Sequence, residues 1–191
     1  MAKEFELKYQ ANPEILRKIQ AKYPGFVAIS METTYYDAPG SPMAARRWTL
    51  RRRLENGRAV CSLKTPGDFL RRGEWEVENG DIAAAIPALC QLGAPEDLLA
   101  LTKDGVHPVC GARFTRLAAQ IPLPGGAVEL ALDEGVFQGN LGEAPFAEVE
   151  VELKAGEESV ALTFAQTLAA KYDLPPETRG KVERAMALRK I

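Results

Sequence analysis

The sequence is poor in histidine and cysteine and has no long apolar run. Its one histidine, His107, argues against a histidine-rich metal site or a triad that uses histidine as the base. The three cysteines, Cys61, Cys90 and Cys110, match no zinc or redox spacing, so we expect free thiols in a reducing cytosol. No stretch reaches the roughly 18 apolar residues of a membrane span. The first residues, MAKEFE, lack the apolar segment of a secretory signal, and we therefore expect a cytoplasmic protein without a membrane partner.

The sequence also has no excess of charge of either sign. It carries 24 basic and 26 acidic residues, a net charge of −2, which gives no overall footprint for nucleic acid. We therefore expect no nucleic-acid partner. A length of 191 residues with 46% apolar residues is ordinary for a soluble globular protein, and we expect one domain over residues 1–191.

Alternation of apolar and polar residues predicts a mainly β protein of the α+β class. Strands are expected at about residues 3–9, 32–38, 48–55, 58–64, 71–78, 108–121, 127–133 and 147–154. Asn56-Gly57 is a strong hairpin signal, and Pro124-Gly125-Gly126 is a further turn. Helices are expected after Asn12, as short pieces broken by Pro87 and Pro95 within residues 81–101, and near residues 157–172 and 178–189. Eight strands with few helices predict an eight-stranded antiparallel β-barrel, or a large curved sheet, with helices packed outside.

Charged residues recur on one face of nearly every predicted strand. In KEFELKY, residues 3–9, the charged Glu4, Glu6 and Lys8 alternate with three apolar residues. The same register holds Arg51 with Arg53, Lys64, Arg72 with Glu74 and Glu76, Arg116, Glu129 with Asp133, and Glu148 with Glu150 and Glu152. Arg113 departs from the register of Arg116, and we expect it to be exposed.

Two interpretations of this charged face are open. An antiparallel sheet often has one hydrated face, which would make the charges ordinary surface residues. Alternatively, a closed barrel would turn the charged face inward as the lining of a tunnel. The second interpretation accounts better for close like charges such as Glu148 and Glu150, which are destabilising unless something binds them.

A tunnel that carries both signs of charge needs an occupant with both signs. Lysine and arginine suit phosphate oxygens, and arginine can bind them as a bidentate fork. Clustered carboxylates without histidine suit a hard cation such as Mg²⁺ or Mn²⁺. A polyphosphate that carries a divalent metal ion has this charge pattern.

The motifs resemble those of a known superfamily. EFELK fits the E-x-E-x-K signature of the CYTH, or triphosphate tunnel metalloenzyme, superfamily. The other motifs follow in the expected order: TTYYDAP, LRRRLENG, SLKTPG, RRGEWEVE, ARFTR, VELALDEG, AEVEVEL and GKVERAMAL. The resemblance covers nearly the whole chain and is greatest to the bacterial inorganic triphosphatase branch. It implies an eight-stranded antiparallel tunnel and metal-dependent hydrolysis of a small-molecule triphosphate.

The resemblance also implies roles for individual residues. The triphosphate would be held by Lys8, Arg51, Arg53, Lys64, Arg72, Arg116 and Lys181. Two Mg²⁺ or Mn²⁺ ions would be held by Glu4, Glu6, Asp133, Glu148 and Glu150. Catalysis would depend on Glu4, Glu6, Lys8, Glu148 and Glu150, with the outer carboxylates Glu74, Glu76, Glu129 and Glu152 orienting the charged groups. For each single acidic residue, the alternative is an internal salt bridge.

Several functions share these features. Inorganic triphosphatase is the first expectation, for a monomer or a homodimer. Thiamine triphosphatase is second, with Trp48 as a candidate to stack on the thiamine ring or, alternatively, as a packing residue. A class IV adenylate cyclase is third, and the absence of the histidine that precedes the arginine pair in cyclases counts against it. A non-catalytic polyphosphate- or nucleotide-binding module would gain nothing from so many acidic residues.

Overall fold

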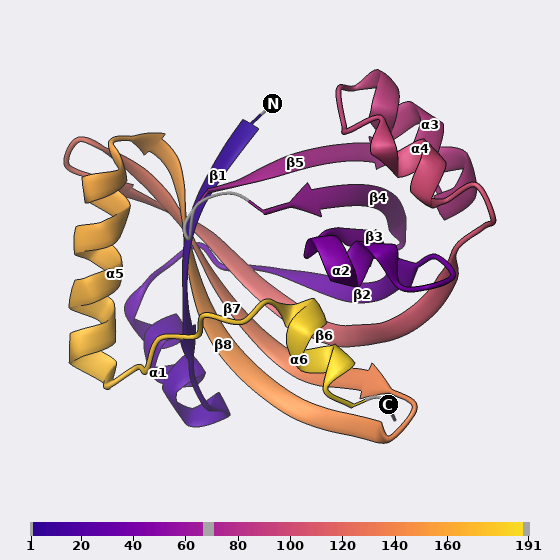
Figure 1. Ribbon diagram of the computed structural model, residues 1–191. Coiled ribbons are helices and arrows are strands. Elements are labelled where there is room, and N and C mark those ends of the chain that lie inside the picture. The colour runs from indigo at the N-terminus through magenta and orange to yellow at the C-terminus, as the bar shows by residue number, and fades with distance from the viewer. Residues whose placement is uncertain (1, 67–70, 189–191) are drawn as a thin grey trace.

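The strands close into a barrel. The computed structural model describes residues 2–66 and 71–188, without the side chains of residues 2–4, 71 and 72. The strands are β1 (Ala2–Gln10), β2 (Val27–Asp37), β3 (Thr49–Glu55), β4 (Arg58–Thr65), β5 (Arg71–Glu78), β6 (His107–Leu123), β7 (Gly126–Gly139) and β8 (Gly142–Gly156). They pair antiparallel in the order β1-β5-β4-β3-β2-β6-β7-β8, and β8 returns to β1 (Figure 1). The predicted antiparallel barrel is confirmed.

Tight turns fix the register of the hairpins. Asn56 and Gly57 both have positive φ, 50° and 87°, as a two-residue turn between twisted strands requires. Gly125, with φ 84°, lies between β6 and β7. Strands β7 and β8 extend beyond their predicted ends because they pair from Gly126 opposite Gly156 to Gly139 opposite Gly142, with one register shift between Ala127 and Val128.

Two sets of helices cover the outside of the barrel. Helices α1 (Pro13–Lys22) and α5 (Glu158–Tyr172) pack on one set of strands, where Phe5 and Tyr9 of β1 join Leu130, Val149 and Val151 in a buried apolar cluster. The apolar face of β1 therefore points outward, and its charged face points inward. In the part of the chain that the structure describes, no helix is long and apolar enough to cross a membrane.

The second set covers strands β3, β4 and β5. It consists of α2 (Pro42–Arg46), α3 (Ile82–Gln91) and α4 (Asp97–Leu101), whose apolar residues pack with Leu50, Cys61 and Leu63 of the sheet. Pro87 lies inside α3, so the prediction that it breaks the helix was wrong. The proline removes one backbone donor, but burial of neighbouring apolar residues such as Leu89 keeps the helix continuous.

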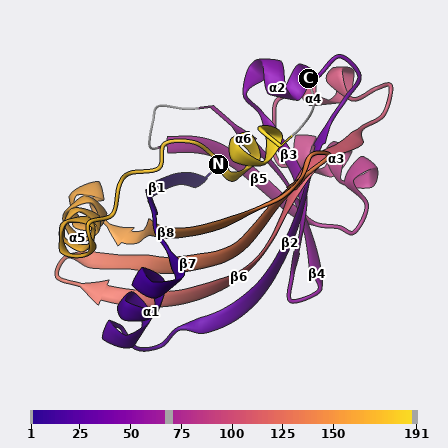
Figure 2. The same ribbon diagram turned by 90° about the horizontal axis from the view of Figure 1, so that it is seen from below.

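The last helix lies inside the curve of the barrel. Figure 2 shows α6 (Lys181–Met186) on the concave side of β6, β7 and β8, opposite to α1. It packs with Phe114, Phe137 and Phe146, which share the inward register of the charged residues. One part of the interior is therefore apolar, although the charge pattern of the strands predicts a charged lining. The described helix is also shorter than the predicted 178–189, and residue 189 lies outside the described residues.

Gly135 allows the close approach of β6 and β7 beneath α6. A Cβ atom there would lie 2.2 Å from the Arg113 carbonyl oxygen and 2.4 Å from the Phe114 Cβ atom. We expect Gly135→Ala to cost about 1–3 kcal/mol, as overpacking does, and to lower the melting temperature by about 5 °C. The control is Gly80→Ala, where no atom lies within 4 Å of the added methyl group. Equal melting temperatures for the two variants would contradict this expectation.

Candidate functional site

Three buried carboxylates form the centre of the interior. Asp133 lies on β7 and Glu148 and Glu150 on β8, with Asp133 directly opposite Glu148 in the strand register. Their exposed fractions are 0%, 0% and 6%, and one carboxylate oxygen from each lies within 4.8 Å of the others. We call these three residues the acidic triad. Oxygen donors at this spacing suit a hard divalent cation.

Among the residues that the structure describes, three cations contact the acidic triad. The Lys181 Nζ atom lies 2.8 Å from Asp133 Oδ2 and 2.7 Å from Glu150 Oε1, and it also contacts Glu148. Arg116 donates from Nε and Nη2 to the two Asp133 oxygens at 2.8 and 2.7 Å and contacts Glu150. Arg184 contacts Glu148. Each triad carboxylate thus takes part in internal ion pairs, the alternative considered for the single acidic residues.

The pKa shifts follow from burial and from these pairs. Burial alone lowers the pKa of Lys181, but the three carboxylates raise it above the ordinary lysine value. Burial raises the pKa of Glu148, and the nearby Glu150 and Asp133 add to that shift. Burial also opposes ionisation of Glu150, yet Lys181 and Arg116 hold its pKa well below the usual range. The triad is therefore a set of carboxylates whose charge depends on the cations beside it.

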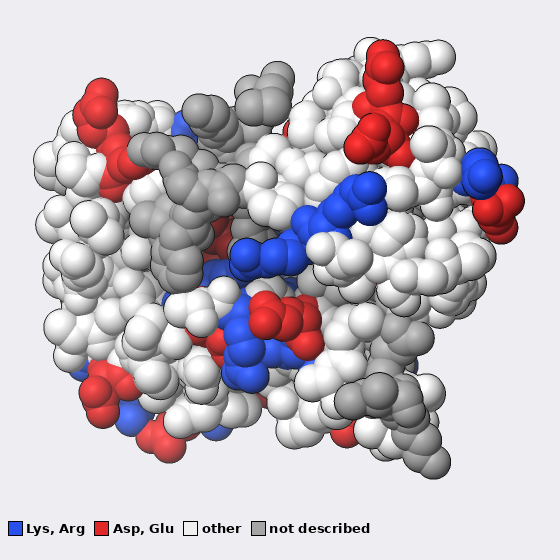
Figure 3. Space-filling view, in the orientation of Figure 1, with Lys and Arg blue, Asp and Glu red and all other residues white. Residues whose placement is uncertain are grey.

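A small cavity adjoins the acidic triad and is ringed by cations. Its volume is about 70 Å³. Its lining includes the charged residues Glu6, Lys8, Arg51, Arg53, Lys64, Arg116, Glu150 and Lys181. We call it the inner cavity. Figure 3 shows lysine and arginine side chains around a hollow in the middle of one face, with acidic side chains beside it. Six of the seven predicted phosphate-binding residues lie together here.

Neighbouring polar groups orient the cations of the inner cavity. Arg51 donates to Ser62 at 2.8 Å and lies 3.3 Å from Glu74 and 3.5 Å from Glu76. Lys64 lies 3.1 Å from Glu74. The outer carboxylates of β5 therefore contact the predicted phosphate-binding residues.

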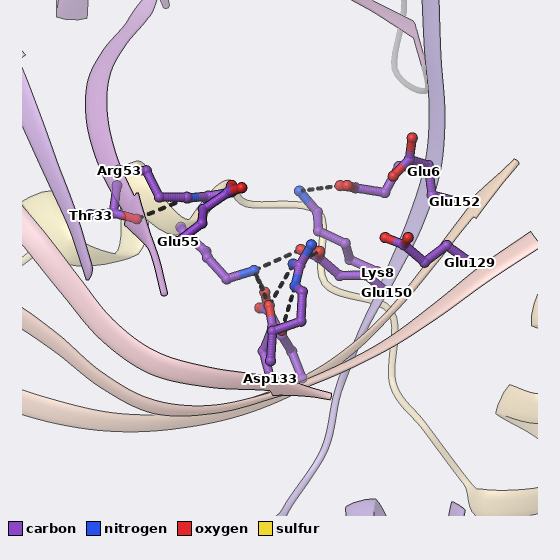
Figure 4. Close-up of polar contacts among 12 residues, drawn as sticks. Glu6, Lys8, Thr33, Arg53, Glu55, Glu129, Asp133, Glu150 and Glu152 are labelled. Atoms are coloured by element: carbon purple, nitrogen blue, oxygen red, sulfur yellow. Dashed lines mark hydrogen bonds and ion pairs between the residues drawn. The ribbon is translucent and has the colours of Figure 1, made fainter. Parts of the chain in front are cut away.

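Arg53 is held differently from the other cations. It donates to Thr33 at 3.1 Å and lies 3.8 Å from Glu55, as Figure 4 shows. Burial and the nearby charge of Arg51 lower its pKa to about 10. An anion bound between two such close arginines would stabilise the charge of the buried one.

A second acidic group lies along the tunnel from the triad. Glu6 pairs in register with Glu152, and Glu152 with Glu129, and Figure 4 shows these side chains in the same part of the interior. Lys8 lies 3.6 Å from Glu6. Lys154 lies 2.7 Å from Glu152 and 4.0 Å from Glu129. The acidic residues thus divide into the buried triad and a more exposed group.

Some predicted residues fall elsewhere. Glu4 and Arg72 are opposite one another in the strand register, but their side chains lie outside the described part of the structure. Arg113 is 61% exposed and lies 3.5 Å from Glu143, as its departure from the register predicted. Trp48 is partly buried and packs against the apolar cluster between α3 and strands β3 and β4.

Sequence reasoning missed two charged residues near the site. Arg184 lies three residues after Lys181 on α6, so helical spacing offered a signal for it. Glu177, only 5% exposed, lies before α6 in a segment without periodicity and offered none.

The fold agrees with comparisons with known proteins. Residues 2–186 match the family model for the CYTH domain. The chain belongs to the CYTH family. The inorganic triphosphatase of Haemophilus influenzae is 26% identical over 197 residues, which span 98% of this chain and 55% of that protein. The CYTH chain thus spans about half the length of this curated relative.

Solved structures share the CYTH fold. The PH1819 protein of Pyrococcus horikoshii is 23% identical with a TM-score of 0.66, over 96% of this chain and 98% of that chain. A Hippeastrum protein described as a putative adenylyl cyclase with a dominant triphosphatase activity is 17% identical with a TM-score of 0.65. That match covers 98% of this chain and 97% of the Hippeastrum chain. At these identities the likeness shows the fold alone.

Proposed function

We propose that this CYTH chain hydrolyses a triphosphate in the presence of a divalent metal ion, with inorganic tripolyphosphate as the preferred substrate. The observation that carries the proposal is the inner cavity, where Lys8, Arg51, Arg53 and Lys64 converge beside the acidic triad. The cations would bind the oxygens of a phosphate chain, and the carboxylates would bind a metal ion that is attached to the same chain. The inorganic triphosphatase of Haemophilus influenzae supports this choice of substrate.

The donor set of the interior fits Mg²⁺ or Mn²⁺. The triad offers oxygen ligands only, and Glu6 and Glu4 on β1 are the further candidates for a second ion. A bound divalent ion would neutralise part of the phosphate charge and would lower the pKa of a bound water molecule. These residues remain the proposed ligands.

The chain's own residues would position the substrate and stabilise its charge. Lys8, Arg51, Arg53 and Lys64 surround the inner cavity and would bind phosphate oxygens along the chain. Arg116 and Lys181 line the same cavity while contacting the triad, so they would bind phosphate oxygens next to the carboxylates. Preorganised cations of this kind stabilise the negative charge that shifts among the phosphate oxygens during transfer. No nucleophilic side chain is required, because water is the attacking group.

The test is a comparison of substrates. Purified protein would be given tripolyphosphate, thiamine triphosphate and ATP in parallel, with Mg²⁺, with Mn²⁺ and with a chelator. We expect the highest kcat/KM for tripolyphosphate, and no phosphate release in the chelator. Binding of tripolyphosphate without turnover of any substrate would overturn the enzyme assignment and leave a binding module.

A second candidate, an organic triphosphatase such as thiamine triphosphatase, is favoured by a larger cavity. This cavity of about 440 Å³ shares Tyr35, Thr49 and Lys64 with the inner cavity. Trp48 and Tyr36 line it as well, so an aromatic group attached to the phosphate chain would find a stacking surface there.

The two candidates predict different effects of one substitution. If an organic group binds in the larger cavity, Trp48→Ala should lower kcat/KM for thiamine triphosphate about tenfold more than for tripolyphosphate, the usual size of a lost stacking contact. The ratio of the two kcat/KM values is measured in wild type and variant. An unchanged ratio would count against the organic substrate.

A further inference from the structure

The segment before α6 is attached to the edge of β1. The backbone N–H of Glu177 donates to the Lys8 carbonyl oxygen at 2.9 Å, and the backbone N–H of Gln10 donates to the Pro175 carbonyl oxygen at 2.8 Å. Tyr9 and Pro176 form an isolated antiparallel bridge between these two bonds. We call residues 173–180 the strap. It ends at Gly180, directly before Lys181, so its placement sets where α6 begins.

A buried carboxylate joins the strap to its surroundings. The Glu177 carboxylate accepts hydrogen bonds from the backbone N–H and Nε of Arg179, at 2.9 and 3.1 Å, and from Arg179 Nη2 at 3.0 Å. It also accepts from Gln10 Nε2 at 3.2 Å. On its inner side it lies 3.8 Å from Arg184 Nη1. Burial disfavours the ionised form, yet the hydrogen bonds from Arg179 and the charge of Arg184 lower the pKa of Glu177.

Arg184 connects Glu177 to the acidic triad. Its guanidinium contacts Glu148 and lies over the Phe137 ring, 4.8 Å from the ring centroid. Its Nε is buried and, among the described residues, finds no hydrogen-bond partner. The ring and the two carboxylates of Glu148 and Glu177 therefore fix the orientation of this side chain.

Charge alternates along this path into the interior. Arg179, Glu177, Arg184, Glu148 and Lys181 carry alternating signs, and each contacts the next. Arg179 is 54% exposed, whereas the side chains of Glu177, Arg184, Glu148 and Lys181 are at most 10% exposed. Neutralising a buried member leaves its neighbours unbalanced, and that costs more than the loss of an exposed charge.

We propose that Glu177 is a positioning residue that, through Arg184, holds Lys181 and Glu148 in place for binding of the phosphate chain. This inference rests on the proposed function, since it assigns Lys181 to phosphate. Glu177 itself does not line the inner cavity, so it acts only through the residues that it orients.

The test measures tripolyphosphate binding by calorimetry with a chelator present, so that no turnover intervenes. We expect Glu177→Gln to weaken binding about tenfold, equivalent to about 1.4 kcal/mol. Glu177→Asp keeps the charge and should recover part of the affinity. The matched control is Arg179→Gln, which removes the exposed partner of the same carboxylate and should change the affinity less than twofold.

A double-mutant cycle separates positioning from a general loss of stability. If Glu177 acts through Arg184, Glu177→Gln combined with Arg184→Gln should bind no more weakly than Arg184→Gln alone. A lower melting temperature with wild-type affinity for Glu177→Gln, or fully additive losses in the cycle, would overturn the proposal. Lack of turnover by the wild-type protein would instead overturn the proposed function, because the binding measurement does not depend on catalysis.

Discussion

Glu150→Gln is expected to lower kcat for tripolyphosphate hydrolysis by about a hundredfold or more, in the range found when a preorganised electrostatic group is removed. Glu150 belongs to both the acidic triad and the lining of the inner cavity. It accepts a hydrogen bond from Lys181 at 2.7 Å and contacts Arg116. The amide would remove a negative ligand from the proposed metal site and loosen both cations. Steady-state kinetics at increasing Mg²⁺ should show a lower kcat and a higher half-saturating Mg²⁺ concentration.

The control for this substitution lies on the same strand. Glu143 is a half-exposed carboxylate of β8 that pairs with Arg113, outside the interior. Glu143→Gln should therefore leave kcat within about twofold of wild type, as surface substitutions usually do. A kcat for Glu150→Gln equal to that of Glu143→Gln would remove Glu150 from the catalytic centre.

Lys181→Met is expected to have the largest effect on stability and to make that stability depend on metal. The side chain is 8% exposed and contacts all three triad carboxylates. Removing one partner of a buried ion pair costs about 3–5 kcal/mol, which corresponds to a melting temperature lower by about 10 °C in a chain of this size. A divalent cation could then replace the lost positive charge between the carboxylates.

Thermal unfolding with and without Mg²⁺ tests this expectation. Mg²⁺ should raise the melting temperature of Lys181→Met more than that of wild type, because the lysine no longer competes for the triad. Lys18→Met serves as the control, since Lys18 is 60% exposed and pairs only with Glu14 in the described contacts. Equal Mg²⁺ shifts in Lys181→Met and wild type would contradict competition between Lys181 and the ion for the triad, and no shift in either protein would remove the triad as the metal site.

The sequence was informative where a strand repeats its pattern. Alternation in β1 and β8 predicted an inward charged face, and the outward packing of Phe5 and Val149 agrees with it. The same register separated Arg116, which is inside, from Arg113, which is outside. A period of two residues is enough to decide which face a side chain joins, once the sheet is closed.

Contacts that depend on tertiary docking could not be predicted. The strap has no periodicity, so nothing in the sequence placed Glu177 against β1 or beside Arg184. Phe114 and Phe146 occupy the inward register, but their role became clear only when α6 packed on them inside the barrel. Pro87 predicts a helix break, whereas burial of the surrounding apolar residues outweighs its missing donor.

Phosphorus-31 NMR of tripolyphosphate incubated with the protein tests the central claim most directly. With Mg²⁺ present, we predict that the tripolyphosphate signals decline while orthophosphate and pyrophosphate appear in equal amounts, and that a chelator stops the reaction. The Glu150→Gln protein should leave the spectrum nearly unchanged over the same period. A wild-type spectrum that does not change with Mg²⁺ or after preincubation with Mn²⁺ would contradict the account of this interior as a triphosphatase site.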